Sequence, residues 1–97
     1  MNKALPSITV ITPSYNQAAF LERTICSVLN QNYSKLEYIV IDNNSDDGSI
    51  DIVRNYAGKL AYWESQPDNG QAHAINKGLK RATGEWVCWQ NSDDIFY

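Results

Sequence analysis

Short apolar segments and amphipathic helical segments alternate along the chain, and this alternation constrains the fold more than any other feature. Four segments are short, apolar and rich in β-branched or aromatic residues, which predicts strands over residues 8–12, 36–41, 60–64 and 86–89. The segments between them carry apolar residues at helical spacing, which predicts helices over residues 18–30, 49–57 and 71–82. The order βαβαβαβ, with strands that lack polar alternation, is typical of a parallel sheet buried under helices.

Individual residues set the expected limits and faces of these segments. Pro13 is expected to end the first strand, and Gly58 is expected to close the second helix at its C-terminus. Trp86 and Trp89 stand three residues apart in the fourth strand, so we expect them on opposite faces, with one buried under a helix. The third helix is expected to turn these residues inward: Ala72, Ile75, Leu79 and Ala82.

The length and even composition of the chain predict one domain. The 97 residues are enough for one hydrophobic core, and no repeat or linker divides residues 1–97. The predicted fold class is α/β, an open, mainly parallel, Rossmann-like sheet with helices on both faces. The apolar residues 95–97 follow a polar loop and look like the start of a further element, so we expect a truncated sheet, the front part of a longer protein. The alternative is that this tail packs back onto the core.

Composition and missing motifs exclude several classes of function. A net charge of −3 argues against a broad basic surface, so no nucleic-acid partner is expected. The P-loop, dinucleotide-binding and nucleophile-elbow patterns are absent. Cys26 and Cys88 are far apart in apolar segments and are expected to be buried free thiols rather than zinc ligands. The first residues lack a signal-peptide apolar region, so we expect a cytoplasmic protein, with the inner face of the membrane as a further location of the full-length form.

Polar loops follow all four predicted strands. Six of the seven aspartates lie in these loops, at positions 42, 46, 47, 68, 93 and 94. Ligands of open α/β sheets bind beyond the carboxyl ends of the strands, so this acidic rim is the candidate binding site. The opposite rim is expected to carry Lys and Arg instead. The alternative explanation is that Asp and Asn favour turns and helix N-termini wherever these occur.

Asp93 and Asp94 are the sharpest candidates on this rim. Two adjacent carboxylates directly after an aromatic-rich strand repel each other unless a cation is present, and their oxygens suit Mg²⁺ or Mn²⁺. A divalent ion would attract phosphate, and the helix that starts near Gly70 would point N–H groups at the same rim. Together these features favour a nucleoside diphosphate site. The alternative is that Asp94 caps a following helix.

Four segments, taken in order and spacing, resemble the N-terminal half of a family 2 glycosyltransferase of the GT-A fold. They are ITVITPSYNQAAFLERTICSVLNQNY, LEYIVIDNNSDDGS, DNGQAHAINKGLKRATGEW and WQNSDD. The resemblance implies binding of a nucleotide diphosphate sugar, with a UDP-sugar favoured, and transfer of the sugar with inversion to a hydroxyl acceptor. It also implies Mg²⁺ or Mn²⁺ as cofactor, a carbohydrate or lipid-linked acceptor, and a role in polysaccharide biosynthesis.

The resemblance assigns the first part of the nucleotide-sugar site to two loops. Pro13, Tyr15 and Asn16 are similar to the family's first nucleotide-contacting loop, where Tyr15 would lie beside the base. Asp42 and Asn43 match an Asp-Asp pair whose second member reads uracil. The second position is Asn here, which leaves the identity of the base open.

The resemblance assigns the metal and the diphosphate to later residues. Asn91, Asp93 and Asp94 match the family's DXD motif, with Asn in place of its first acid. Asp93 would approach the ribose or the donor sugar, and Asp94, together with Asp93, would bind the metal. Lys77 would help to neutralise the diphosphate, because Ile75 stands where many members have a basic residue.

The family places the acceptor site and the catalytic base after the DXD motif. We therefore expect a donor-binding half that is inactive by itself. Its uncovered apolar surface is expected to lead either to a homo-oligomer or to modest stability. Two other classes of α/β module bind Mg²⁺: phosphate-receiving receivers and nucleotidyltransferases. A receiver needs an acidic pair after its first strand, and a nucleotidyltransferase needs a Gly-rich basic loop there, whereas residues 13–16 provide neither.

Overall fold

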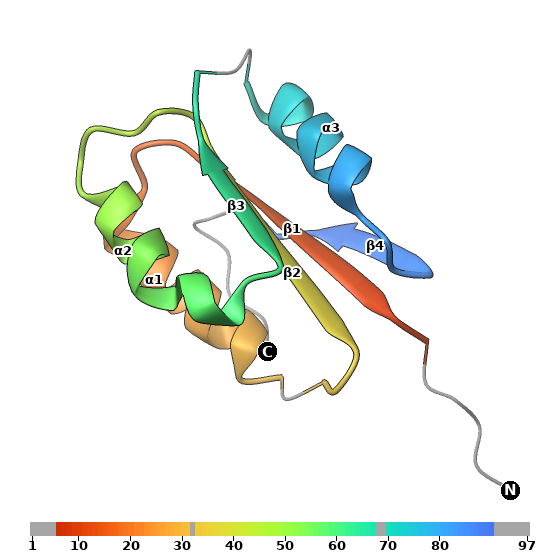
Figure 1. The fold of residues 1–97 in the computed structure, drawn as a ribbon. Coiled ribbons are helices and arrows are strands. Elements are labelled where there is room, and N and C mark those ends of the chain that lie inside the picture. Colours follow the sequence, from red (N-terminus) through yellow and green to blue (C-terminus); the bar gives the residue numbers. More distant parts are fainter. Residues whose placement is uncertain (1–5, 32, 68–69, 91–97) are drawn as a thin grey trace, which may run out of the picture.

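Four strands and three α-helices alternate along the chain in the computed structural model, which describes residues 6–31, 33–67 and 70–90 (Figure 1). The strands are β1 Ile8–Ser14, β2 Leu36–Asp42, β3 Tyr62–Ser65 and β4 Trp86–Trp89. The helices are α1 Ala18–Leu29, α2 Ser49–Tyr56 and α3 Gln71–Arg81, and a short 3₁₀ helix, η1, covers Ala57–Lys59. The predicted order of elements is confirmed.

The strands form one parallel sheet in the order β3-β2-β1-β4. Residue Ile8 pairs with Leu36 on one side and with Trp86 on the other, so β1 is central. At the carboxyl end, Ser14 pairs with Asp42, which pairs with Ser65. This register aligns the ends of three strands, and the loops that follow them therefore meet at one rim.

Helices cover both faces of the sheet, as predicted. Figure 1 shows α1 and α2 on one side and α3 on the other. The first side holds the larger core cluster: Val10, Leu21, Ile25, Val28, Tyr38, Val40 and Val53. The second side holds a smaller cluster: Ile11, Ile39, Ile41 and Ala74. No helix among the described residues is long and apolar enough to cross a membrane.

Strand β1 runs through Pro13 to Ser14, two residues beyond its predicted end. The Asn43 N–H donates to the Ser14 carbonyl at 2.8 Å, and the Gln90 N–H donates to the Ile11 carbonyl at 2.9 Å. Backbone groups of a strand alternate between its two neighbours, so the nitrogen of Pro13 faces the β4 side, past the last β4 pair at Ile11. Proline is tolerated there because its nitrogen faces no paired residue of β4.

Helix α3 packs on the sheet with a different face from the predicted one. Ala74 is buried, and a Cβ atom at Gly78 would lie only 2.6 Å from Cγ2 of Ile11. Ala72 and Leu79, expected inward, are exposed. Small residues at positions i and i+4 let the helix backbone approach the sheet closely. A prediction based on the spacing of larger apolar residues does not detect such a face.

The end of α2 also differs from the prediction. The helix passes directly into η1, which contains Gly58, and within the described chain only Gly48 and Gly70 have positive φ among the glycines. Gly58 therefore does not form a left-handed C-cap. The backbone instead tightens into a 3₁₀ turn, in which the Leu60 N–H donates to the Ala57 carbonyl at 3.2 Å.

Strand β4 is exposed along its length. Trp86 pairs with Ile8 and Trp89 with Ile11, on opposite faces as predicted, but the two side chains are 66% and 58% exposed. The expectation that one tryptophan is buried is wrong, because the helices of the described chain lie over β1 and β2. Cys88 on this strand is exposed as well, and Cys26 is half-buried. The expectation of two buried thiols is therefore wrong for Cys88 and only partly met by Cys26.

Candidate functional site

Asp42 occupies the centre of the carboxyl rim, at the end of β2. Its side chain is completely buried. The Ser45 N–H donates to Oδ2 at 2.8 Å, the Ser45 hydroxyl donates to Oδ1 at 2.6 Å, and the Ser65 hydroxyl donates to Oδ2 at 2.7 Å. These bonds offset the cost of burying a carboxylate and tie the ends of β2 and β3 together.

Two hydrogen bonds in opposite directions join the loop after β1 to the loop after β2. The Asn16 N–H donates to Oγ of Ser45 at 2.9 Å, and the Asp46 N–H donates to Oδ1 of Asn16 at 3.0 Å. Asn16 and Asn44 have φ values of 48° and 47°, in the left-handed region that asparagine tolerates. The two loops therefore form one linked unit.

Asp47 adds a third link between these loops. The Ala18 N–H, at the start of α1, donates to Oδ2 at 2.9 Å. The Ser49 N–H and hydroxyl, at the start of α2, donate to Oδ1 at 3.1 and 2.6 Å. Burial alone would raise the pKa of Asp47, but the hydrogen bonds from Ser49 and Ala18 outweigh it and hold the pKa below its ordinary value.

The predicted residues of the first two loops come together on this rim. Tyr15 is 58% exposed, so its ring is available to a ligand. Asn16 is exposed, Asn43 is half-buried, and Pro13 is buried within β1. Tyr15 and Asn43 follow directly on the paired strand ends Ser14 and Asp42, so the register sets their separation.

Lys77 lies on α3 and is paired within the protein. Its Nζ lies 3.1 Å from Oε2 of Glu64 and donates to the Pro67 carbonyl at 3.4 Å. Burial would raise the pKa of Glu64, but the bonds from Lys77 and Tyr62 keep that pKa low. The positive charge of Lys77 is therefore balanced by Glu64.

The hydroxyl of Ser14 is the one buried side-chain oxygen or nitrogen of the described residues that has no hydrogen-bond partner. Ser14 is only 4% exposed and pairs with Asp42 in the sheet. A buried donor without an acceptor costs free energy. Because Ser14 is the last residue of β1, this unpaired hydroxyl lies at the carboxyl rim.

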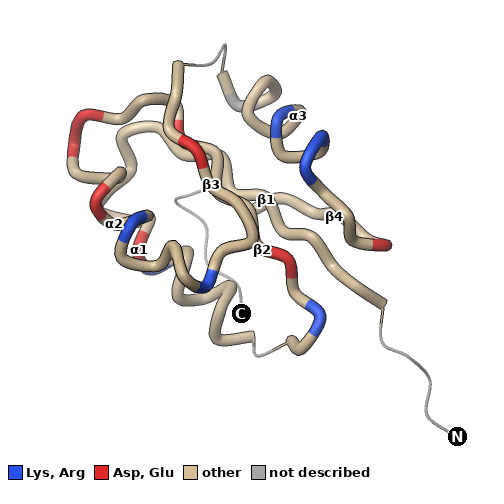
Figure 2. The backbone as a smooth tube through the Cα atoms, in the orientation of Figure 1, with Lys and Arg blue, Asp and Glu red and all other residues tan. Residues whose placement is uncertain are grey.

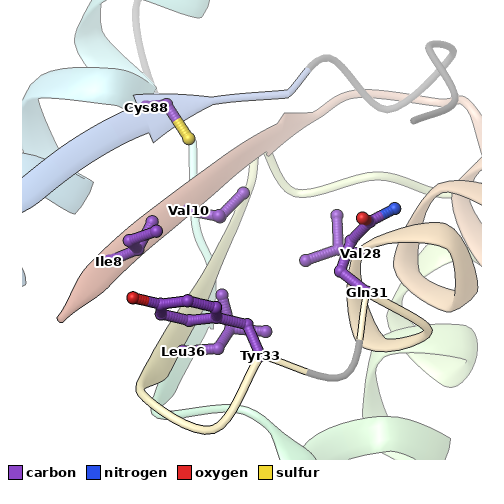
Figure 3. Close-up of a pocket in the computed structure, with 7 residues that line it drawn as sticks. All are labelled: Ile8, Val10, Val28, Gln31, Tyr33, Leu36 and Cys88. Carbon is purple, nitrogen blue, oxygen red and sulfur yellow. The ribbon is translucent and has the colours of Figure 1, made fainter. Parts of the chain in front are cut away.

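A concave region lies near the starts of β1 and β2, at the end of the sheet opposite the carboxyl rim (Figure 3). It has a volume of about 290 Å³ and a mainly apolar lining: Ile8, Val10, Val28, Gln31, Tyr33, Leu36 and Cys88. In Figure 3 these side chains project from β1, β4, the start of β2, and the end of α1 with the segment that follows it. The lining has no convergent charged groups, so it does not fit a diphosphate.

Charges are less strictly divided between the two rims than predicted. Figure 2 shows acidic positions on the loop after β2, where Asp46 and Asp47 lie. The opposite rim carries Lys35, Lys59, Lys80 and Arg81 but also Glu37 and Glu85. Basic residues therefore outnumber acidic ones at that rim, as expected, but they do not exclude them.

The predicted metal ligands fall outside the described residues. Asn91, Asp93 and Asp94 belong to that part of the chain, so the structure does not place them. Over the ranges that are described, no group of three or more His, Cys, Asp or Glu residues could hold a metal ion. Asp42 and Asp47 already accept hydrogen bonds from neighbouring serines of the protein.

Sequence reasoning did not assign to Ser45, Asp47 and Ser65 their role of holding the rim together. The spacing of Asp42 and Ser45 is a usable signal, because an Asp often accepts the N–H of a residue further along the turn. Asp47 followed by Gly48 and Ser49 likewise marks a helix start. Ser65 carries no such local signal, since its bond to Asp42 depends on the strand pairing.

The four-stranded parallel sheet, with helices on both faces and a linked polar rim at its carboxyl edge, is an α/β fold of the kind seen in GT-A glycosyltransferases. The Glycosyl transferase family 2 model matches residues 9–97. The chain belongs to glycosyl transferase family 2. It is similar to an uncharacterized glycosyltransferase of Mycobacterium tuberculosis, with 38% identity over 92 residues, which cover 94% of this chain and 35% of that protein. It is equally similar to an uncharacterized glycosyltransferase of Haemophilus influenzae, at 38% identity, covering 94% and 38% of the two chains.

Solved glycosyltransferase structures share the fold. The mannosyltransferase PcManGT from Pyrobaculum calidifontis, in complex with GDP-Man and Mn²⁺, superposes with a TM-score of 0.85 at 37% identity, covering 94% of this chain and 28% of that one. S. aureus TarS 1-349 in complex with UDP gives a TM-score of 0.75 at 29% identity, covering 90% and 27%. The predicted fold class and family are confirmed. The chain spans only about a third of the length of the relatives it matches.

Proposed function

We propose that this chain binds the nucleotide diphosphate sugar donor of an inverting glycosyltransferase. The observation that carries the proposal is the linked rim, in which Asn16, Ser45 and Asp46 hold Tyr15 and Asn43 at the ends of two paired strands. The relatives support it, because PcManGT is in complex with GDP-Man and Mn²⁺ and TarS with UDP. These ligands belong to PcManGT and TarS, and they support a donor of the same chemical class for this chain.

Each residue of the rim takes a role in this proposal. The exposed Tyr15 ring packs beside the base, and Asn43 hydrogen-bonds its edge. Asp93 approaches the ribose or the donor sugar, next to Asn91. Lys77, with its charge balanced by Glu64, donates a hydrogen bond to the diphosphate rather than acting as an unpaired cation.

The proposed cofactor is Mg²⁺ or Mn²⁺, held by Asp94 and Asp93. When bound, the ion offsets the negative charge that the departing nucleoside diphosphate gains. An inverting transfer also needs a base that removes the proton from the acceptor hydroxyl. Since the chain spans about a third of its relatives, we assign that base and the acceptor site to sequence outside residues 1–97, and we expect the chain alone to bind donor without transferring sugar.

Uracil is the base that we propose, although Asn43 discriminates less sharply than a carboxylate. An Asn oxygen accepts a hydrogen bond from a ring N–H, and its nitrogen can also donate to a ring acceptor. A neutral hydrogen bond contributes about 1 kcal/mol, against about 1.5–3 kcal/mol for one to a charged group. UDP should therefore bind only a few times more tightly than GDP, and Asn43→Asp should widen that preference.

Calorimetry with UDP, GDP, CDP and dTDP tests the proposal. The expected result is binding that strengthens when Mn²⁺ is added, with UDP tightest, and loss of the Mn²⁺ effect in Asp94→Ala. A clear preference for GDP or dTDP would overturn the assignment of the base alone. If Mn²⁺ does not change the affinity for UDP in the unchanged chain or in Asp94→Ala, the proposed metal site is wrong. If the unchanged chain binds none of the four nucleotides, the proposed function is wrong.

A further inference from the structure

The surroundings of Asp42 bear on how the rim is held in shape. This carboxylate lies at the tip of β2, where the family resemblance places a nucleotide contact, yet its side chain is 0% exposed. Its two oxygens accept from the Ser45 N–H, the Ser45 hydroxyl and the Ser65 hydroxyl. A nucleotide cannot reach the carboxylate without displacing these donors.

We propose that Asp42 is a positioning residue, which acts through Ser45 to hold the Tyr15–Asn16 loop against the loop that carries Asn43, and which does not touch the nucleotide. The inference rests on the proposed function, since it concerns how the same nucleotide site is shaped. It changes the role of Asp42 from ligand contact to internal anchor.

The direction of the Ser45 hydroxyl links Asp42 to the first loop. An ionised carboxylate only accepts hydrogen bonds, so Oδ1 of Asp42 draws the hydroxyl proton of Ser45 toward itself at 2.6 Å. The lone pairs of the same Ser45 oxygen are then free to accept the Asn16 N–H at 2.9 Å. The chain of bonds from Asp42 through Ser45 to Asn16 therefore has one favoured orientation.

Ser65 provides a matched comparison on the other oxygen. Its hydroxyl donates to Oδ2 of Asp42 at 2.7 Å, almost the same distance as the bond from Ser45. Ser65 ends β3, which pairs with β2 and not with β1. The two serines thus bind the same carboxylate, but only Ser45 reaches the loop that carries Tyr15.

The first experiment compares Ser45→Ala, Ser65→Ala and Asp42→Asn by calorimetry, with UDP and with pyrophosphate in the presence of Mn²⁺. Pyrophosphate lacks the nucleoside, so it reports on the site without the Tyr15 loop. We expect Ser45→Ala and Asp42→Asn each to weaken UDP binding about tenfold, which is the size of one lost charge-assisted hydrogen bond. The affinity of these two variants for pyrophosphate should change less than about twofold. The affinity of Ser65→Ala for UDP and for pyrophosphate should also change less than about twofold.

The double variant Asp42→Asn with Ser45→Ala separates positioning from contact. If Asp42 acts through Ser45, the double variant should bind UDP no more weakly than either single variant, because residues of one network are not additive. A further full loss in the double variant, or a loss of pyrophosphate binding in Asp42→Asn, would show direct contact and overturn the proposal. An equal loss of UDP binding in Ser65→Ala would also overturn it.

Amide hydrogen exchange tests the same link without any ligand. The Asn16 and Asp46 amides should exchange faster in Ser45→Ala and Asp42→Asn than in the unchanged chain, and Ser65→Ala should leave them unaltered. If the unchanged chain binds no nucleotide, the proposed function fails, and this measurement still decides whether Asp42 holds the loop. Unaltered exchange of both amides in Ser45→Ala would overturn the positioning role.

Discussion

Asp47 provides the acceptor for two helix starts at once. The N-cap residues of α1 and α2, Gln17 and Gly48, make no side-chain cap hydrogen bond. Asp47 accepts the Ala18 N–H of α1 and the Ser49 N–H of α2 in their place. Its negative charge also complements the positive ends of both helix dipoles. Single side chains of this rim therefore serve two elements that are far apart in sequence.

Ser14 and Ser45 should respond oppositely to the same substitution. Ser14→Ala removes a buried hydroxyl that has no partner, so the free energy of unfolding should stay within about 0.5 kcal/mol or rise. Ser45→Ala removes the bond to Asp42 and the acceptor of Asn16, and should cost about 1–3 kcal/mol. Urea unfolding of both variants measures the difference, and a loss of more than about 1 kcal/mol in Ser14→Ala would show a partner for its hydroxyl.

Glu37 should make stability depend on pH at the acid end. It accepts hydrogen bonds from the Thr9 hydroxyl at 2.7 Å and from the N–H and hydroxyl of Thr83 at 2.8 and 2.7 Å. Burial would raise the pKa of Glu37, but these bonds outweigh it and lower the pKa below its ordinary value of 4.5. The stabilisation is therefore complete above pH 4.5 and is lost as the pH falls through the lowered pKa.

The test is urea unfolding from pH 7 down to pH 3 for the unchanged chain and for Glu37→Gln. The amide cannot ionise, so the variant should start less stable at pH 7 and lose less stability on acidification. Identical pH profiles for the two proteins would contradict a stabilising Glu37 carboxylate. Glu85→Gln, on an exposed carboxylate of the same rim, is the control.

At the scale of elements, the contact between α3 and the sheet sets a strict size limit. A Cβ atom at Gly78 would lie 2.6 Å from Cγ2 and 2.9 Å from Cδ1 of the fully buried Ile11. Alanine usually stabilises a helix by about 1 kcal/mol relative to glycine, but overpacking a core costs about 1–3 kcal/mol. Gly78→Ala should therefore be destabilising, or neutral at best, in thermal unfolding.

Gly58→Ala is the matched control for that prediction. A Cβ at Gly58 meets nothing within 4 Å, so this substitution should be neutral or stabilising. Adding Ile11→Ala to Gly78→Ala should remove part of the clash, and the two changes should not be additive. A Gly78→Ala chain as stable as Gly58→Ala would show that Ile11 moves aside at no cost.

The sequence predicts the order of elements well, because each strand and helix is marked by local pattern. The face of α3 that packs on the sheet was not predictable from hydrophobicity. That face carries the small residues Ala74 and Gly78, which allow the helix to approach Ile11 closely. The position of Asp42 on the rim follows from its place at the end of β2. The role of Asp42 does not follow from the sequence. An Asp at this position could contact a ligand or anchor the loops from inside, and the burial of its side chain distinguishes the two.

At the scale of the whole molecule, β4 leaves large apolar side chains exposed on both faces of the sheet. Trp86, Val87 and Trp89 are exposed on the strand, and Leu79 is exposed on α3. Exposed patches of this kind drive association, so the chain should self-associate as its concentration rises. Light scattering should show this, and Trp86→Lys with Trp89→Lys should reduce it more than Phe20→Lys on α1. A monomer at every concentration would contradict the prediction.

The strand order has a consequence for synthesis on the ribosome. Of the four strands, β1 is synthesised first and its second neighbour β4 is synthesised last. Ile8 therefore cannot pair with Trp86 until the three intervening α-helices and two strands have been made. While β1 pairs with β2 and β3 follows, the β4 side of β1 remains an unpaired edge, of the kind that other chains can join. A nascent chain stalled before residue 86 should therefore depend on chaperones more than a chain released after β4 has paired.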